Sequence, residues 1–147
     1  MRLSLIIPLF NEEDSLIELN KAIIKVVSSM KIKHEIIYVD DGSTDNSLEI
    51  ARKGLPNDSH FDILDLPWNI GHQPAIKKGI LHILNEYEGV TNVVVLDSDG
   101  EDDVSFITEI LEYIDYDKVL VERGKRNEAW SFRILYRLYK ILFKLVT

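Results

Sequence analysis

The amino-acid sequence predicts an α/β protein, built on a mostly parallel sheet flanked by helices. Short apolar runs alternate along the chain with segments whose apolar residues recur at helical spacing, which is the pattern of βαβ units. The run Val93–Leu96 is apolar at every position, as expected of a strand buried on both faces. The chain has 147 residues, 46% of them hydrophobic, which is the size and composition of one globular domain.

Each predicted strand is a short apolar segment that ends in polar or turn-forming residues. The strands are expected at residues 3–8, 34–39, 61–66, 93–96 and 118–122. A helix is expected to begin at 11–14, where acidic residues favour a helix N-terminus. Further helices are predicted from Thr44 or Asp45 to Lys53, from His72 or Gln73 to Tyr87, and over 104–114. Pro74 is compatible with the first turn of its helix.

Polar loops follow four of these strands, at residues 8–13, 40–45, 68–72 and 97–103. The carboxyl ends of parallel strands lie at one edge of a sheet, and open α/β sheets bind ligands at that edge. Four polar loops at one edge therefore predict a single binding site.

Asp97-Ser98-Asp99 follows the apolar run 93–96 directly, and five of the seven residues from 97 to 103 are acidic. Carboxylates this close raise one another's pKa unless a cation lies between them. Mg²⁺ and Mn²⁺ prefer such oxygen ligands, and Mg²⁺ commonly uses one or two carboxylates plus substrate phosphates. The alternative interpretation is an acidic turn that caps the next helix.

Charge is unevenly distributed along the chain. The net charge is −8, and there is no cysteine, which excludes disulfides, zinc thiolates and cysteine nucleophiles. Residues 123–147 carry seven basic side chains and one acid, and the first 122 residues carry ten basic and 24 acidic ones. An acidic body argues against nucleic-acid binding, and a basic tail is expected to contact an anionic partner.

The tail at residues 129–147 has the pattern of an amphipathic helix. Its basic residues recur at intervals of four, three and four positions, which places Arg133, Arg137, Lys140 and Lys144 on one stripe. Apolar and aromatic residues fill the rest of the surface. We expect a helix in an anionic membrane interface; the alternative is a helix packed on the domain with its basic stripe in water. No apolar stretch is long enough to span a bilayer.

Four motifs in order resemble family 2 glycosyltransferases. They are Ile-Pro-Leu-Phe-Asn-Glu-Glu (7–13), Val-Asp-Asp-Gly-Ser-Thr-Asp (39–45), Asn-Ile-Gly-His-Gln-Pro-Ala (69–75) and Leu-Asp-Ser-Asp (96–99). The resemblance covers nearly the whole chain and implies an inverting enzyme of the Rossmann-like GT-A fold. The segment 71–75 and the basic aromatic tail resemble the branch of dolichol-phosphate mannose synthases and undecaprenyl-phosphate glycosyltransferases.

The resemblance implies a UDP- or GDP-sugar as donor and Mg²⁺ or Mn²⁺ as cofactor, held by Asp97 and Asp99. Asp40 or Asp41 would accept hydrogen bonds from the base, and the start of the helix at 71–72 would face the diphosphate. His72 is either a ligand of the donor or a structural residue. The full predicted nucleotide-sugar site is Pro8, Asn11, Glu12, Asp40, Asp41, Ser43, Asn69, Gly71 and His72.

The implied reaction moves a hexose to a polyprenyl phosphate at the cytosolic membrane face. Arg123, Arg126 and Arg133 would hold the acceptor phosphate, with Arg126 joining Asp97 and Asp99 as a catalytic residue. The predicted organisation is a nucleotide-sugar-binding core at 1–125 and a basic helix at 126–147, in a peripheral cytoplasmic protein cut short at its C-terminus. The sequence is also compatible with a homo-oligomer.

Two other functions are compatible with the sequence. The first keeps the donor but transfers the sugar to a hydroxyl of a glycan or lipid-linked saccharide, with an acid of residues 101–103 as general base. The second is a truncated, inactive module that binds a nucleotide or a membrane.

Overall fold

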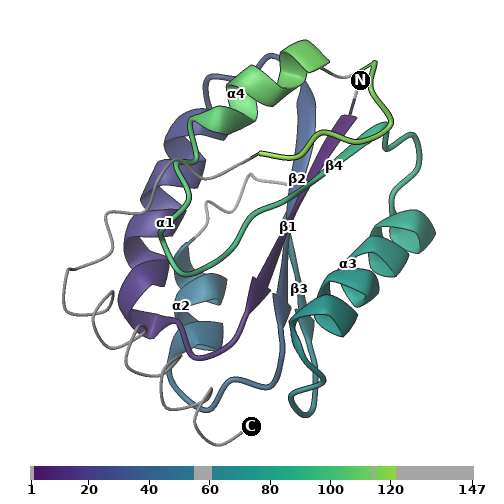
Figure 1. The fold of residues 1–147 in the computed structure, drawn as a ribbon. Coiled ribbons are helices and arrows are strands. Elements are labelled where there is room, and N and C mark those ends of the chain that lie inside the picture. Colours follow the sequence, from purple (N-terminus) through teal and green to yellow (C-terminus); the bar gives the residue numbers. More distant parts are fainter. Residues whose placement is uncertain (1, 55–60, 114, 122–147) are drawn as a thin grey trace, which may run out of the picture.

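The computed structural model describes residues 2–54, 61–113 and 115–121. Strands and helices alternate through this part of the chain (Figure 1). They are β1 (Arg2–Leu9), α1 (Glu13–Val27), β2 (Lys33–Asp40), α2 (Ser47–Gly54), β3 (Phe61–Asp65), α3 (His72–Glu86), β4 (Asn92–Val95), α4 (Phe106–Ile110) and a 3-10 helix (Leu111–Tyr113). None of the helices in the described ranges is long and apolar enough to cross a membrane.

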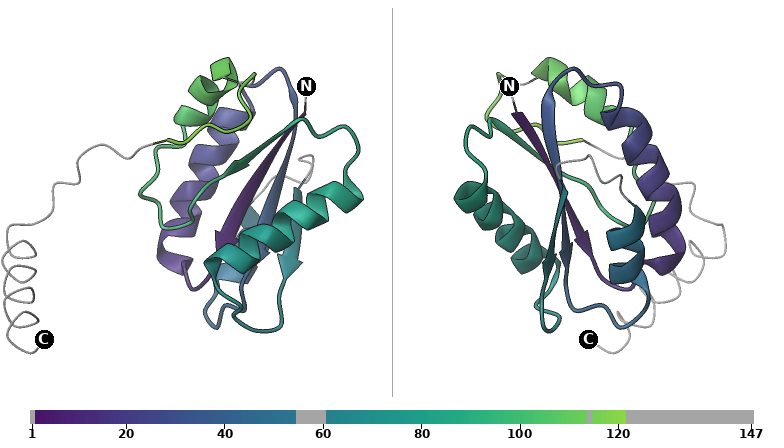
Figure 2. Two further views of the ribbon diagram at one scale, coloured as in Figure 1. Left: turned by 45° about the vertical axis from the view of Figure 1, so that its right-hand side comes forward. Right: turned by 180° about the vertical axis from the view of Figure 1, so that it is seen from behind.

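All four strands are parallel, in the order β3-β2-β1-β4. Helices α1, α2 and α4 cover one face of the sheet and α3 covers the other (Figures 1 and 2). The central strands β1 and β2 are buried on both faces. The predicted parallel sheet flanked by helices is therefore confirmed, and its carboxyl edge brings together the loops after β1, β2, β3 and β4.

Side chains alternate between the two faces, as the pleat of a strand requires. In β1, Leu5 and Ile7 join the larger apolar cluster under α1, whereas Ile6 joins the smaller cluster under α3. Gly79 lets α3 approach closely, because a Cβ atom there would lie 2.9 Å from Ile6 Cγ2.

A charged group lies under the far end of α3. The Glu35 carboxylate is fully buried and accepts hydrogen bonds from Ser4 Oγ at 2.6 Å and Arg2 Nε at 2.8 Å. Arg2 also donates to the Glu88 carbonyl at 2.9 Å and lies over the Tyr87 ring. These contacts fasten the amino end of the sheet to the C-terminus of α3.

The structure corrects the expected burial of residues 93–96. Val94 and Leu96 are buried under the α1 face, but Val93 and Val95 are 41% and 38% exposed in the described part of the molecule. β4 is at the edge of this sheet, and α3 packs on β1 and β2 instead of covering it. The apolar run is therefore buried on one face only.

Two further element predictions need correction. Residues 118–121 form no strand, because none of the described strands pairs with them and an apolar run becomes a strand only where it can pair. The helix expected over 104–114 is shorter: α4 covers Phe106–Ile110 and tightens into the 3-10 helix at Leu111–Tyr113. The other predicted elements agree with the structure apart from small shifts of their ends.

Candidate functional site

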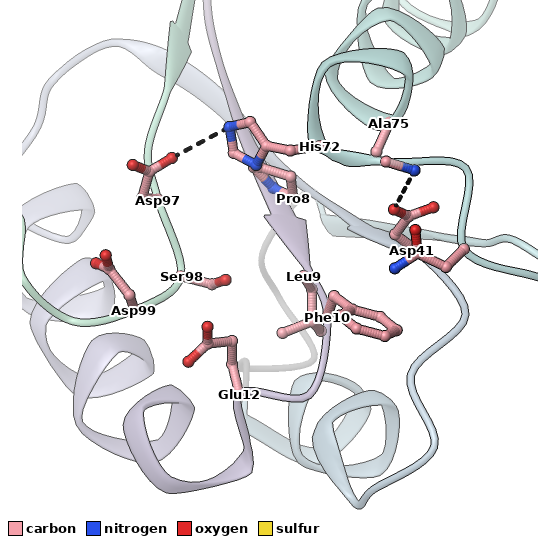
Figure 3. Close-up of a pocket in the computed structure, with 12 residues that line it drawn as sticks. Pro8, Leu9, Phe10, Glu12, Asp41, His72, Ala75, Asp97, Ser98 and Asp99 are labelled. Atoms are coloured by element: carbon pink, nitrogen blue, oxygen red, sulfur yellow. Dashed lines mark hydrogen bonds and ion pairs between the residues drawn. The ribbon is translucent and has the colours of Figure 1, made fainter. Parts of the chain in front are cut away.

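A cleft of about 340 Å³ opens at the carboxyl edge of the sheet (Figure 3). It lies where the chain after β4 departs from β1. Ile6 accepts the last bond of this ladder, from Leu96 N–H at 3.0 Å. Pro8 is next on the same side of β1 and has no N–H to continue the ladder. The missing donor lets the two chains separate, and the cleft forms between them.

Most of the predicted site residues line this cleft. Eight do so from all four loops of the edge: Pro8, Glu12, Asp41, Asn69, Gly71, His72, Asp97 and Asp99. The fold therefore brings residues of all four motifs together around one cleft. Asn11, Asp40 and Ser43 do not line it, and Arg123, Arg126 and Arg133 are outside the described residues, as are the predicted tail helix and the boundary at 125.

The Asp97-Ser98-Asp99 segment crosses one wall of the cleft (Figure 3). Ser98 is buried, whereas the side chain of Asp97 is 41% exposed. Asp99 Oδ1 accepts the backbone N–H of Glu101 at 2.9 Å, and Gly100 completes that turn with a φ of +73°. The two carboxylates thus reach the cleft from a turn held by its own hydrogen bonds.

His72 lies opposite Asp97 at the first position of α3. Its Nε2 is 3.6 Å from Asp97 Oδ1, and both side chains are about half exposed. The contact is an ion pair only when His72 is protonated, and solvent weakens it, so it adds little to stability. The contact does bring the N-terminus of α3 and the first acid of the 97–99 segment to the same cleft.

Asp41 holds the turn that precedes α3. Its Oδ1 accepts the Ile70 N–H at 2.7 Å and its Oδ2 accepts the Gly71 N–H at 2.8 Å. The turn needs a glycine, because Gly71 has a φ of +97°. Each carboxylate oxygen has a second lone pair, so Asp41 can also accept a bond from a ligand in the cleft.

Asp40 does not line the cleft, unlike the adjacent Asp41. It points to the other face of the sheet, is 1% exposed, and accepts the Ser43 N–H at 3.2 Å through Oδ2. Its Oδ1 has no hydrogen-bond partner among the described residues. Burial raises the pKa of this carboxyl; the hydrogen bonds from Ser43 lower it in part, and the nearby carboxylates of Asp65 and Asp45 raise it further.

Asn11 and Ser43 join two loops of the edge to each other. Asn11 N–H donates to Ser43 Oγ at 3.1 Å, and Asn11 Oδ1 accepts the Thr44 N–H at 2.8 Å. Asn11 has a φ of +55°, a conformation that asparagine tolerates better than most residues. This pairing fixes the loop after β1 against the loop after β2 and so sets one side of the cleft.

The predicted site left out four residues that line the cleft, Leu9, Phe10, Ala75 and Ser98, and one residue behind it, Ser15. The Ser15 hydroxyl is 2.8 Å from the Ser98 carbonyl oxygen. Phe10 belongs to the motif at 7–13 and is 42% exposed, so its position directly after the strand was a usable signal. Nothing in the sequence connects Ser15 with Ser98, because their contact depends on how α1 packs beside the loop after β4.

The sequence and the fold were compared with those of known proteins. The family model "Glycosyl transferase family 2" matches residues 4–146. A protein of Edwardsiella ictaluri named undecaprenyl-phosphate 4-deoxy-4-formamido-L-arabinose transferase is 36% identical over 148 residues, covering 98% of this chain and 44% of that protein. The uncharacterized glycosyltransferase YkcC of Bacillus subtilis is 32% identical over 142 residues, covering 92% of this chain and 42% of YkcC.

The chain thus spans less than half the length of these curated relatives. Among solved structures, that of S. aureus TarS residues 1–349 has a TM-score of 0.56 at 22% identity, covering 87% of this chain and 40% of TarS 1–349. This likeness concerns the fold, which is that of GT-A glycosyltransferases. The family match over nearly the whole length, on a parallel sheet of this type, establishes that the chain belongs to glycosyl transferase family 2.

Proposed function

We propose that this chain takes part in the transfer of a hexose from a UDP- or GDP-sugar to a polyprenyl phosphate, with inversion at the transferred carbon. One observation carries the proposal: Asp97 and Asp99 line the same cleft as the N-terminus of α3. Family membership supports glycosyl transfer. The relatives named undecaprenyl-phosphate transferases support the acceptor class.

The donor diphosphate would lie between α3 and the 97–99 segment. The N-terminus of a helix attracts anions through its unpaired N–H groups and its dipole, and Gly71 allows close approach of the backbone. His72, at the first position of α3, would contact the diphosphate. Asp41 would accept a hydrogen bond from the base, and Glu12 would lie near the ribose or the base.

The carboxylates of Asp97 and Asp99 suit a divalent cation that the substrate also coordinates. Within the described ranges, no set of three or more His, Asp or Glu side chains is placed to hold a metal alone. Two cleft-lining carboxylates match the Mg²⁺ arrangement in which substrate phosphates and water complete the coordination. A bound Mg²⁺ or Mn²⁺ would neutralise charge on the nucleoside diphosphate as it leaves.

The proposed reaction needs no general base. The second pKa of a phosphate monoester is about 6, so a polyprenyl phosphate is already a nucleophile at neutral pH. One of its oxygens forms the new bond to the anomeric carbon from the face opposite the leaving group. The bond between that carbon and the diphosphate oxygen breaks, and its electron pair leaves with the nucleoside diphosphate.

The acceptor side is proposed from sequence. Arg123, Arg126 and Arg133 would bind the phosphate of the lipid, and the basic helix at 129–147 would lie in the cytosolic membrane interface. The curated relatives are more than twice as long as this chain. Turnover by this chain alone is therefore a separate question from donor binding.

The test compares donor binding and transfer in one preparation. Calorimetry with UDP and with GDP, each with Mn²⁺, measures binding; a radiolabelled donor with undecaprenyl phosphate as sole acceptor measures transfer. Asp97→Asn and Asp99→Asn should each lower Mn²⁺-dependent nucleotide binding by at least about tenfold, because each removes a charged ligand. Asp14→Asn is the matched control, since Asp14 is an exposed acid in α1 that does not line the cleft.

Normal transfer by both variants would overturn the metal role. Wild-type protein that uses a saccharide acceptor but not the lipid phosphate would support the hydroxyl alternative. Nucleotide binding without any transfer would indicate a donor-binding module that requires further chain for turnover.

A further inference from the structure

The Ser15 hydroxyl lies behind the cleft, within hydrogen-bond distance of both Glu12 and Ser98. Its Oγ is 2.8 Å from the carbonyl oxygen of Ser98 and 3.0 Å from Glu12 Oε2. The backbone carbonyl of Glu12 is also within reach, at 3.2 Å. A hydroxyl has one proton to donate, and the Ser98 carbonyl is the nearest of these three acceptors. Ser15 thus connects the first turn of α1 with a segment 83 residues further along the chain.

The bonded carbonyl belongs to the peptide that joins Ser98 to Asp99. Its orientation therefore affects where the chain leaves Ser98, and hence where the two flanking carboxylates lie. Ser98 itself is buried, and the following Gly100 is close enough that a Cβ atom there would lie 3.5 Å from Ser15 Cβ. The turn after β4 is therefore in packing distance of α1 at the same point where the hydrogen bond forms.

A local role alone does not account for this geometry. Serines in helices often bond a carbonyl three or four residues earlier, and Ser29 does so near the C-terminal end of α1, where its Oγ donates to the Val26 carbonyl at 2.6 Å. Ser15 has the equivalent local acceptor, the Glu12 carbonyl, at the longer distance of 3.2 Å. The shorter contact is the long-range one, to the cleft wall.

We propose that Ser15 is a positioning residue of the donor site, which holds the Ser98 peptide so that Asp97 and Asp99 both face the cleft. It acts through those carboxylates and does not itself contact the donor. This inference rests on the proposed function, because it assumes that the two acids serve Mn²⁺-dependent binding of a nucleoside diphosphate.

The experiment compares Ser15→Ala, Ser15→Thr and the control Ser29→Ala. Calorimetry with UDP, and in parallel GDP, is run with Mn²⁺ and again with EDTA. Ser15→Ala should weaken Mn²⁺-dependent binding about fivefold, the effect of one lost hydrogen bond, and leave binding in EDTA unchanged. Ser15→Thr keeps the hydroxyl and should restore binding to within about twofold. Ser29→Ala should match the wild type in both conditions.

Hydrogen exchange of the ligand-free proteins adds a readout that needs no metal. Peptides covering 97–103 should exchange faster in Ser15→Ala than in wild type, with no change in Ser29→Ala. If Ser15→Ala bound the nucleotide in Mn²⁺ as tightly as the wild type does, the inference would be overturned. A loss of affinity of equal size in Mn²⁺ and in EDTA would also overturn it. Wild-type protein that binds neither nucleotide in Mn²⁺ would instead refute the proposed function, and the positioning role with it.

Discussion

Asp41 fastens the loop after β2 to Gly71, whose N–H donates to Asp41 Oδ2 at 2.8 Å, while the neighbouring Ile70 N–H donates to Oδ1 at 2.7 Å. Both bonds have a charged acceptor and are nearly shielded from water, since Asp41 is 3% exposed. Such bonds are among the stronger ones in proteins. The position of α3, and with it one wall of the cleft, therefore depends on this carboxylate.

Asp41→Asn should destabilise the protein by about 1–3 kcal/mol, because the amide nitrogen would face a backbone N–H that also needs an acceptor. Chemical denaturation followed by tryptophan fluorescence measures the free energy of unfolding. Asp65→Asn is the control: its carboxylate pairs with Arg52 at 3.2 Å but is about half exposed, so the loss should stay below about 1 kcal/mol. Equal losses in the two variants would contradict the role of Asp41.

Gly42 and Gly89 form a matched pair, with φ values of +73° and +72°. A Cβ atom on Gly42 would lie 2.7 Å from the backbone carbonyl carbon of Trp68, whereas one on Gly89 would meet nothing within 4 Å. Gly89→Ala should cost about 1–2 kcal/mol of stability, the strain of the left-handed conformation alone. Gly42→Ala should cost at least about 1 kcal/mol more, because the loop before α3 must also move.

Denaturation of the two glycine variants under the same conditions gives that difference. Nucleotide binding supplies a second comparison, since only Gly42 is next to the cleft. A Gly42→Ala protein as stable as Gly89→Ala would show that the backbone at Trp68 yields without cost.

Asp40 should make the stability of the protein depend on pH. Its pKa is raised in the folded state, chiefly by burial, so the stabilisation it provides is complete below the pKa of the unfolded chain and is lost as pH rises through the folded value. Asp40→Asn removes this titration. The free energy of unfolding of the variant minus that of wild type should therefore increase as pH rises above the ordinary range of aspartate, then level off.

Denaturation curves at a series of pH values measure that difference, with Asp14→Asn as the exposed control. A difference that does not vary with pH, or that falls as pH rises, would show that burial does not raise the pKa of the Asp40 carboxyl.

Arg2 and Arg52 each pair with one carboxylate, in contrasting surroundings. The partner of Arg2 is Glu35, which is fully buried, whereas Arg52 and Asp65 are both about half exposed. Arg2→Ala leaves a buried charge without its cation and should cost about 3 kcal/mol. Arg52→Ala should cost less than about 1 kcal/mol. Denaturation of both variants tests this, and similar losses would mean that water reaches Glu35.

Much of the fold follows from local pattern. Apolar runs and helical spacing predicted four strands and three helices to within a few residues, because these patterns reflect backbone geometry that neighbours in the chain set. They failed for the burial of 93–96 on both faces and for a strand at 118–121. Whether an apolar run is covered, or is paired at all, depends on segments that are distant in the sequence.

The candidate site also has features that the sequence predicts and features that depend on how distant segments pack. The order of residues along the chain places acids and glycines after the strands, and this predicts that the four motifs meet at one edge of a parallel sheet. Tertiary structure alone decided that Asp41 faces the cleft while Asp40 lies beneath the other layer of helices, and that Ser15 contacts Ser98. Alternation places neighbouring side chains on opposite faces, but only the packing of helices decides which face encloses a site.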